Sequence, residues 1–115
     1  FNEAIRLNPQ SAIPYGNRGM VLGDMGQYAE ALADYNRAIE LNPNYATAHS
    51  WYAEHLSRMG RHDEAIRMVR RVPELDPASV FSSMIVAWIL YFARRYDEAI
   101  EWGRRTVTVT IGWYE

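Results

Sequence analysis

The three histidines are the residues whose type could bind a metal ion. His55 lies six residues after His49 and seven before His62. Two ligands on one helix face need a spacing of about four residues, and both of these spacings differ from it. No carboxylate completes a ligand set at a recognised spacing. We therefore expect the histidines to have structural roles, with no metal site.

Arginines occur in adjacent pairs, which could contact phosphates because guanidinium groups bind them well. The pairs are Arg70-Arg71, Arg94-Arg95 and Arg104-Arg105. Acidic residues lie three or four positions from Arg37, Arg71 or Arg105, where they can pair along a helix: Asp34, Glu40, Glu74 and Glu101. The net charge is −2. These features indicate that the arginines lie on a solvent-exposed outer face, and we expect no direct nucleic-acid partner.

The composition excludes several kinds of catalysis. The chain has no cysteine, and all 12 of its basic residues are arginine. Disulfides, thiolate catalysis, lysine Schiff bases and phosphate-loop lysines are therefore excluded. The sequence contains no glycine-rich phosphate loop, nucleophile elbow or Ser/His/Asp arrangement. We expect no enzyme activity, no catalytic residues and no cofactor.

The most apolar segment, residues 80–93, is too short to span a membrane. As a helix it would be about 21 Å long, whereas the hydrocarbon layer is about 30 Å thick. Ser82 and Ser83 interrupt it, and Arg94 and Arg95 follow it. The first residues show no signal-peptide pattern. We expect a cytoplasmic protein with no membrane partner.

The sequence repeats itself at an interval of 34 residues. Three prolines and three leucines recur at this spacing: Pro9, Pro43 and Pro77, and Leu22, Leu56 and Leu90. Glu30, Glu64 and Glu98 recur as well, each followed by alanine. An acid suits the positive start of a helix, so these glutamates are not a catalytic set. A fixed period of this length predicts a solenoid of stacked units.

Each unit reads as two antiparallel helices. Apolar residues recur at helical spacing in 12–25 and again in 28–41. Gly26 and Gly60 supply the left-handed residue that ends a helix. The segments "NPN" and "DPA" end the second helix of each pair, because the residue before a proline avoids helical geometry. The predicted fold is all-α.

These units resemble tetratricopeptide repeats (TPRs). In the first unit the signature positions of that family read Tyr15, Gly19, Leu22, Ala31, Tyr35, Ala38 and Pro43. The resemblance implies a single TPR domain over 1–115, built as a right-handed α-solenoid of helical hairpins. Its parts are the second helix of a truncated repeat (1–9), repeats at 12–45 and 46–79, and a degraded repeat at 80–115.

Two departures from the family pattern predict local irregularities. Pro73 lies inside the last turn of a predicted helix, which it should bend or shorten. In the last repeat Ile111 replaces the proline, and "TVTVTIGWYE" is rich in β-branched residues. We expect its second helix to fray beyond about Arg105, or the tail to be extended.

The TPR resemblance implies that the first helix of each repeat lines a concave peptide-binding groove. The predicted groove residues are Asn17, Met20, Trp51, Glu54, Arg58, Phe81, Met84, Ile85, Trp88, Tyr91 and Phe92. The groove is small and polar at one end and aromatic at the other, as expected of a contact surface. Burial of the aromatic end by the intact protein or its oligomer is an equal alternative. A chaperone-tail clamp is disfavoured, since Asn17 matches its pattern but Trp51 and Ile85 do not.

Three functions remain open. The first, which we favour, is a scaffold that binds a protein, peptide or helix, with an aromatic anchor in the last repeat. The second is a regulatory module, because "NYATAHSWYAEHLSRMGRHDEAI" and "WILYFARRYDEAI" resemble TPR regions of bacterial winged-helix transcription regulators. The third is assembly into a homo-oligomer through open repeat ends or the aromatic surface.

Overall fold

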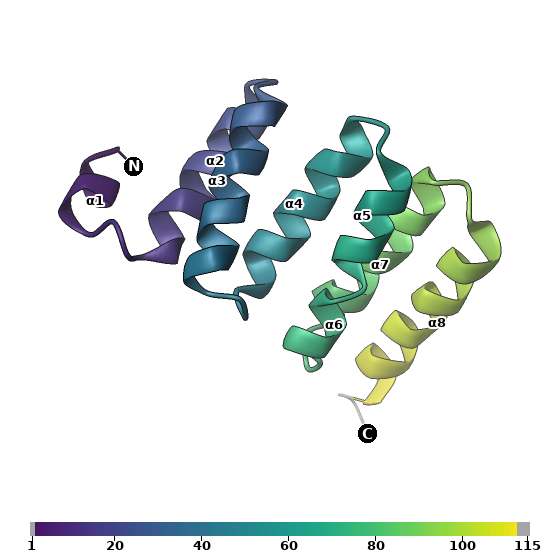
Figure 1. Ribbon diagram of the computed structural model, residues 1–115. Coiled ribbons are helices and arrows are strands. Elements are labelled where there is room, and N and C mark those ends of the chain that lie inside the picture. The colour runs from purple at the N-terminus through teal and green to yellow at the C-terminus, as the bar shows by residue number, and fades with distance from the viewer. Residues whose placement is uncertain (1, 113–115) are drawn as a thin grey trace.

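The computed structural model describes residues 2–112, and the side chains of residues 2–106. All secondary structure in this part of the chain is helical. The helices are α1 (Asn2–Leu7), α2 (Ala12–Asp24), α3 (Tyr28–Leu41), α4 (Ala46–Arg58), α5 (His62–Val69), α6 (Val72–Leu75), α7 (Val80–Phe92) and α8 (Tyr96–Gly112). They follow one another along a single direction, from α1 at one end to α8 at the other (Figure 1).

The turns inside the hairpins share one geometry. Gly26 and Gly60 have φ values of +83° and +80°, which confirms their predicted left-handed conformation. Arg94 stands at the equivalent position after α7, with φ of +64°. After each of these residues a backbone N–H reaches back to a carbonyl five residues earlier, as from Gln27 to Leu22 at 2.9 Å. This pairing satisfies carbonyls that the end of a helix leaves free.

Prolines end the second helices at the predicted positions. α3 ends at Leu41 and α6 at Leu75, and the following Asn42 and Asp76 lie outside the helical region, with φ of −143° and −141°. Each of these residues precedes a proline, which disfavours helical geometry. Within the second hairpin, α5 ends at Val69 and Pro73 lies in the first turn of α6. The predicted shortening at Pro73 is therefore confirmed.

The prediction that the last helix frays beyond about Arg105, or that the tail is extended, is wrong for the described residues, because α8 continues to Gly112. Each β-branched residue lowers the stability of a helix by less than about 0.7 kcal/mol relative to alanine. No proline or glycine interrupts 104–111. The Thr106 hydroxyl donates to the Trp102 carbonyl at 3.2 Å, so it is satisfied within the helix. The last part of the predicted tail, 113–115, lies outside the described residues.

The hairpins stack on one another to form an α-solenoid. α2 pairs with α3, α4 with α5, and α7 with α8. The first helix of each later hairpin packs on the preceding one: α4 contacts α2 and α3, and α7 contacts α4 and α5. The main core runs through all three hairpins and includes Tyr35, Leu56, Val69, Val86 and Leu90. Among the described residues, no helix is both long and apolar enough to cross a membrane.

Candidate interaction groove

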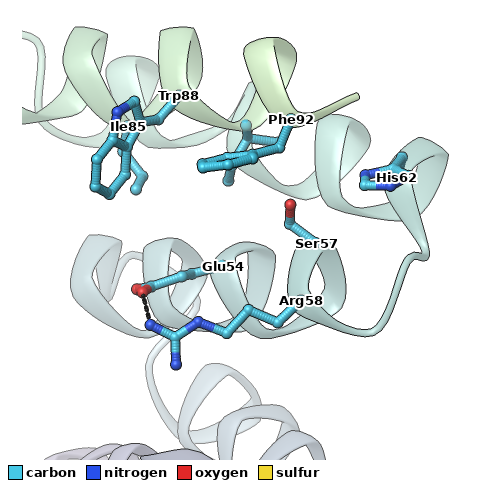
Figure 2. Close-up of a pocket in the computed structure, with 8 residues that line it drawn as sticks. Glu54, Ser57, Arg58, His62, Ile85, Trp88 and Phe92 are labelled. Atoms are coloured by element: carbon cyan, nitrogen blue, oxygen red, sulfur yellow. Dashed lines mark hydrogen bonds and ion pairs between the residues drawn. The ribbon is translucent and has the colours of Figure 1, made fainter. Parts of the chain in front are cut away.

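A groove of about 450 Å³ lies between the first helices of the second and third hairpins. Its lining residues are Glu54, Ser57 and Arg58 on α4, His62 at the start of α5, and Ile85, Trp88, Ile89 and Phe92 on α7. We call it the α4–α7 groove. Figure 2 shows the α4 and α7 side chains facing one another across it.

Helical spacing brings these side chains to the groove. On α7, Ile85, Ile89 and Phe92 are separated by four and three residues, so they share one face of the helix. Glu54 and Arg58 are four apart on α4. Because α7 packs on α4, these two faces oppose each other. The groove therefore follows from the stacking of two hairpins and needs no special loop.

The two walls differ in character. Ile85 and Ile89 are buried and form an apolar floor, whereas Trp88 and Phe92 are 60% and 55% exposed. The Trp88 and Phe92 rings meet edge to face, with centroids 5.9 Å apart. Such contacts between rings hold them in a defined orientation. The α7 wall thus presents ordered aromatic surface to solvent.

The α4 wall carries a paired charge. Arg58 Nη2 donates to Glu54 Oε1 at 2.7 Å, the contact drawn in Figure 2. Arg58 Nη1 also lies 3.8 Å from a carboxylate oxygen of Asp24 on α2. Both acids remain accessible for further hydrogen bonds, because the side chains of Glu54 and Asp24 are 32% and 63% exposed. This wall can therefore contact a peptide backbone or a polar side chain.

The structure brings only some of the predicted groove residues together. Five line the α4–α7 groove: Glu54, Arg58, Ile85, Trp88 and Phe92. The other six lie elsewhere: Asn17 and Met20 on α2, Trp51 on α4, and Phe81, Met84 and Tyr91 on α7. Trp51 is half-buried against Tyr35, with ring centroids 6.3 Å apart. A ligand-binding role for any of the eleven remains a prediction.

Ser57, His62 and Ile89 also line the groove, although they are not among the eleven predicted residues. Ile89 is buried, and the family pattern does not include it among the groove positions. His62 begins α5 and reaches the groove from the turn. The signal that could have found Ile89 is its spacing of four from Ile85.

The histidines on α4 are part of the packed interior. His49 is buried, with Nε2 3.0 Å from the Pro43 carbonyl and Nδ1 3.1 Å from the Met68 sulfur. His55 Nδ1 donates to the Trp51 carbonyl at 2.6 Å. In the part of the chain that the structure describes, no group of three or more histidine, aspartate or glutamate side chains is placed to hold a metal ion.

The arginines form ion pairs, partly different from those expected. Arg37 pairs with Glu40 at 3.3 Å, as predicted. Asp34, however, accepts two hydrogen bonds from Arg18 of α2, at 2.6 and 2.7 Å, and is buried. This bidentate pair joins the two helices of the first hairpin, and an analysis of spacings within one helix could not find it. Arg70 of the second hairpin pairs with Glu98 of the third at 2.8 Å.

Comparisons with known proteins agree with this architecture. Two family models described as tetratricopeptide repeat match residues 24–85 and 1–33. A search of curated proteins found no match. Two crystal structures of MamA resemble the chain, with TM-scores of 0.81 and 0.84 at 23% and 22% identity.

Those alignments cover 91% and 96% of this chain but 57% and 64% of the two MamA chains. The chain therefore spans less than two thirds of their length. At this level of identity the likeness shows the fold alone. The family models rest on the sequence itself, and the first of them covers more than half of the 115 residues. The chain belongs to the tetratricopeptide repeat family.

Proposed function

We propose that the chain is a non-catalytic protein-interaction scaffold that binds an extended peptide or a helix in the α4–α7 groove. The observation that carries the proposal is the pair of exposed, ordered rings, Trp88 and Phe92, above a buried aliphatic floor. Aromatic side chains beside a desolvated pocket are the usual centres of binding energy. The Glu54–Arg58 pair on the opposite wall supplies polar contacts at the rim.

α7 offers a matched pair of phenylalanines for a test. Phe92 lines the groove and Phe81 does not, yet their exposed fractions are nearly equal, 55% and 54%. Peptides that bind the chain can be selected from a random library against the immobilised protein. The substitution Phe92→Ala in the chain should weaken the binding of these peptides by about 2 kcal/mol. With Phe81→Ala the change should stay within about 0.5 kcal/mol. Equal losses for the two variants, measured by calorimetry, would contradict binding in this groove.

The resemblance to bacterial regulators supports an alternative in which the same groove belongs to a regulatory module. Neither matching family model is specific to such regulators. Self-assembly is the other alternative, and light scattering after size exclusion separates it from the scaffold. A mass near the 13.3 kDa of the chain at two concentrations tenfold apart supports the scaffold, whereas a mass that rises with concentration supports self-assembly.

A further inference from the structure

The charged side chains around the α4–α7 groove are unevenly divided between its two walls. α7 carries no charged residue between Val80 and Phe92. On the α4 wall, Arg58 lies between two carboxylates, those of Glu54 and of Asp24 on α2. Two acids and one arginine leave this cluster with a net charge of −1. The groove therefore has one apolar, aromatic wall and one negatively charged wall.

The carboxylate of Glu54 can accept further hydrogen bonds from a group in the groove. It accepts one from Arg58 through Oε1 at 2.7 Å, whereas a carboxylate has room for about four. Figure 2 shows this carboxylate opposite the Trp88 ring, with the Arg58 guanidinium on the side away from that ring. His62, which could add positive charge, lies at the other end of the groove (Figure 2). A donor in the groove can therefore reach Glu54 without displacing Arg58.

Trp88 supplies the second part of a site for a cation. A guanidinium within about 6 Å of an indole ring centre is attracted by the negative charge of the ring face. The chain itself contains this contact, since the guanidinium carbon of Arg105 lies 4.2 Å from the centroid of the Trp102 ring. Within residues 2–106 no such contact involves Trp88, which is 60% exposed. Its ring can therefore receive a cation from a ligand.

The same groups disfavour an acidic ligand. Arg58 lines the groove but already contacts Glu54 and Asp24. A ligand carboxylate would approach Glu54, and like charges placed side by side oppose binding. Lysine has the right charge, but its ammonium is a compact, strongly hydrated group without a flat face. A planar guanidinium can both stack on Trp88 and donate two hydrogen bonds to Glu54.

We propose that the α4–α7 groove is specific for a peptide that carries an arginine, whose guanidinium lies between the Trp88 ring and the Glu54 carboxylate. An apolar residue next to this arginine packs on the floor formed by Ile85 and Ile89. This inference rests on the proposed function, because it names the chemistry of the peptide that the groove binds. The preferred charge is opposite to that of a ligand for a carboxylate clamp.

Peptides selected from a random library against the immobilised chain test the inference. We expect an arginine in the sequences whose binding is weakened by Phe92→Ala. In several such peptides this arginine is replaced by citrulline, which has nearly the same shape and no charge, and Kd is measured by calorimetry. The replacement should weaken binding about tenfold, as expected for the loss of hydrogen bonds to a charged group. Lysine at the same place should restore only part of the affinity.

Variants of the chain assign the contact to Glu54. Glu54→Gln should weaken the arginine peptides about tenfold and change the affinity of their citrulline versions by less than about twofold. Glu64→Gln is the matched control and should change neither, because Glu64 pairs with Arg61 at 2.6 Å but lies outside the groove. Trp88→Leu should reduce the preference for arginine over citrulline, whereas Phe81→Ala should not. Circular dichroism verifies that the variants fold.

Selected peptides that require Phe92 but contain no arginine would overturn the inference and leave the proposed function standing. Equal effects of citrulline on the unmodified chain and on the Glu54→Gln variant would have the same meaning. If no selected peptide depends on Phe92, the proposed function fails and the inference fails with it. A dimer of the unliganded chain that Glu54→Gln, but not Glu64→Gln, converts to a monomer would show that a second copy supplies the arginine. That result would refute the choice of a peptide ligand.

Discussion

At the residue scale, the spacing of glycines on α2 carries information about the neighbouring hairpin. In a helix, replacing glycine by alanine is normally stabilising by about 1 kcal/mol. Gly23→Ala should instead lower the free energy of unfolding by about 1–3 kcal/mol, because the new methyl group meets the buried His55 ring. Gly103→Ala on α8 is the matched control, since no described atom lies within 4 Å of its added Cβ. Urea denaturation of both variants is the measurement, and stabilisation by both would show that His55 moves freely.

Tyr35 supports a prediction about pH. Burial raises the pKa of its phenol, which contacts His55 at 3.3 Å in the core. Below the unfolded-state pKa of about 10 the group is protonated in both states, so its contribution to stability is fully present. Above that pH only the unfolded state loses the proton, and stability falls by up to about 1.4 kcal/mol per pH unit. Tyr35→Phe should flatten this decline in denaturation curves recorded between neutral and alkaline pH. An unchanged slope would refute the assignment to Tyr35.

At the element scale, helix ends marked by glycine or proline could be predicted from the sequence, whereas the length of a helix without such a residue could not. Glycine and proline act through local backbone geometry, so Gly26, Gly60 and Pro73 could be interpreted from the sequence alone. The length of α8 could not be predicted in this way. The helix propensities of β-branched residues differ from that of alanine by only a few tenths of a kcal/mol per residue, which is too little to decide where a helix ends. The groove was half predictable for a related reason. The repeat position says which face of a helix a residue occupies, but Trp51 turns toward Tyr35 through packing between hairpins.

Of the three equivalent turn positions, two are occupied by glycine and the third by Arg94, whose φ is +64°. A left-handed conformation is unfavourable for a residue with a Cβ by about 1–2 kcal/mol. Arg94→Gly should therefore stabilise the α7–α8 hairpin by about 1 kcal/mol, and the reciprocal Gly60→Arg should destabilise the α4–α5 hairpin by a similar amount. Chemical denaturation of the pair measures both effects. Destabilisation by Arg94→Gly would mean that contacts of the Arg94 side chain stabilise the hairpin by more than its left-handed backbone destabilises it.

At the scale of the whole molecule, each hairpin contacts only its neighbours, so local stability should vary along the solenoid. α1 has no buried residue and contacts only α2 among the described helices, although Arg18 donates to Asn2 at 3.1 Å. α4 contacts α2, α3, α5, α6 and α7 and buries Leu56 completely within the main core. Figure 1 shows the same contrast, with α1 at the end of the row and α4 in its middle. Opening of α1 should not require opening of the core.

Hydrogen exchange resolves this gradient. The amides of α1 should exchange at nearly unprotected rates, whereas those of α4 should exchange only by opening of the core hairpins. Removal of residues 1–9 should accordingly lower the free energy of unfolding less than Leu56→Ala, for which about 2–5 kcal/mol is expected. Equal protection of α1 and α4 would contradict a nearest-neighbour description and would mean that the solenoid opens as one unit.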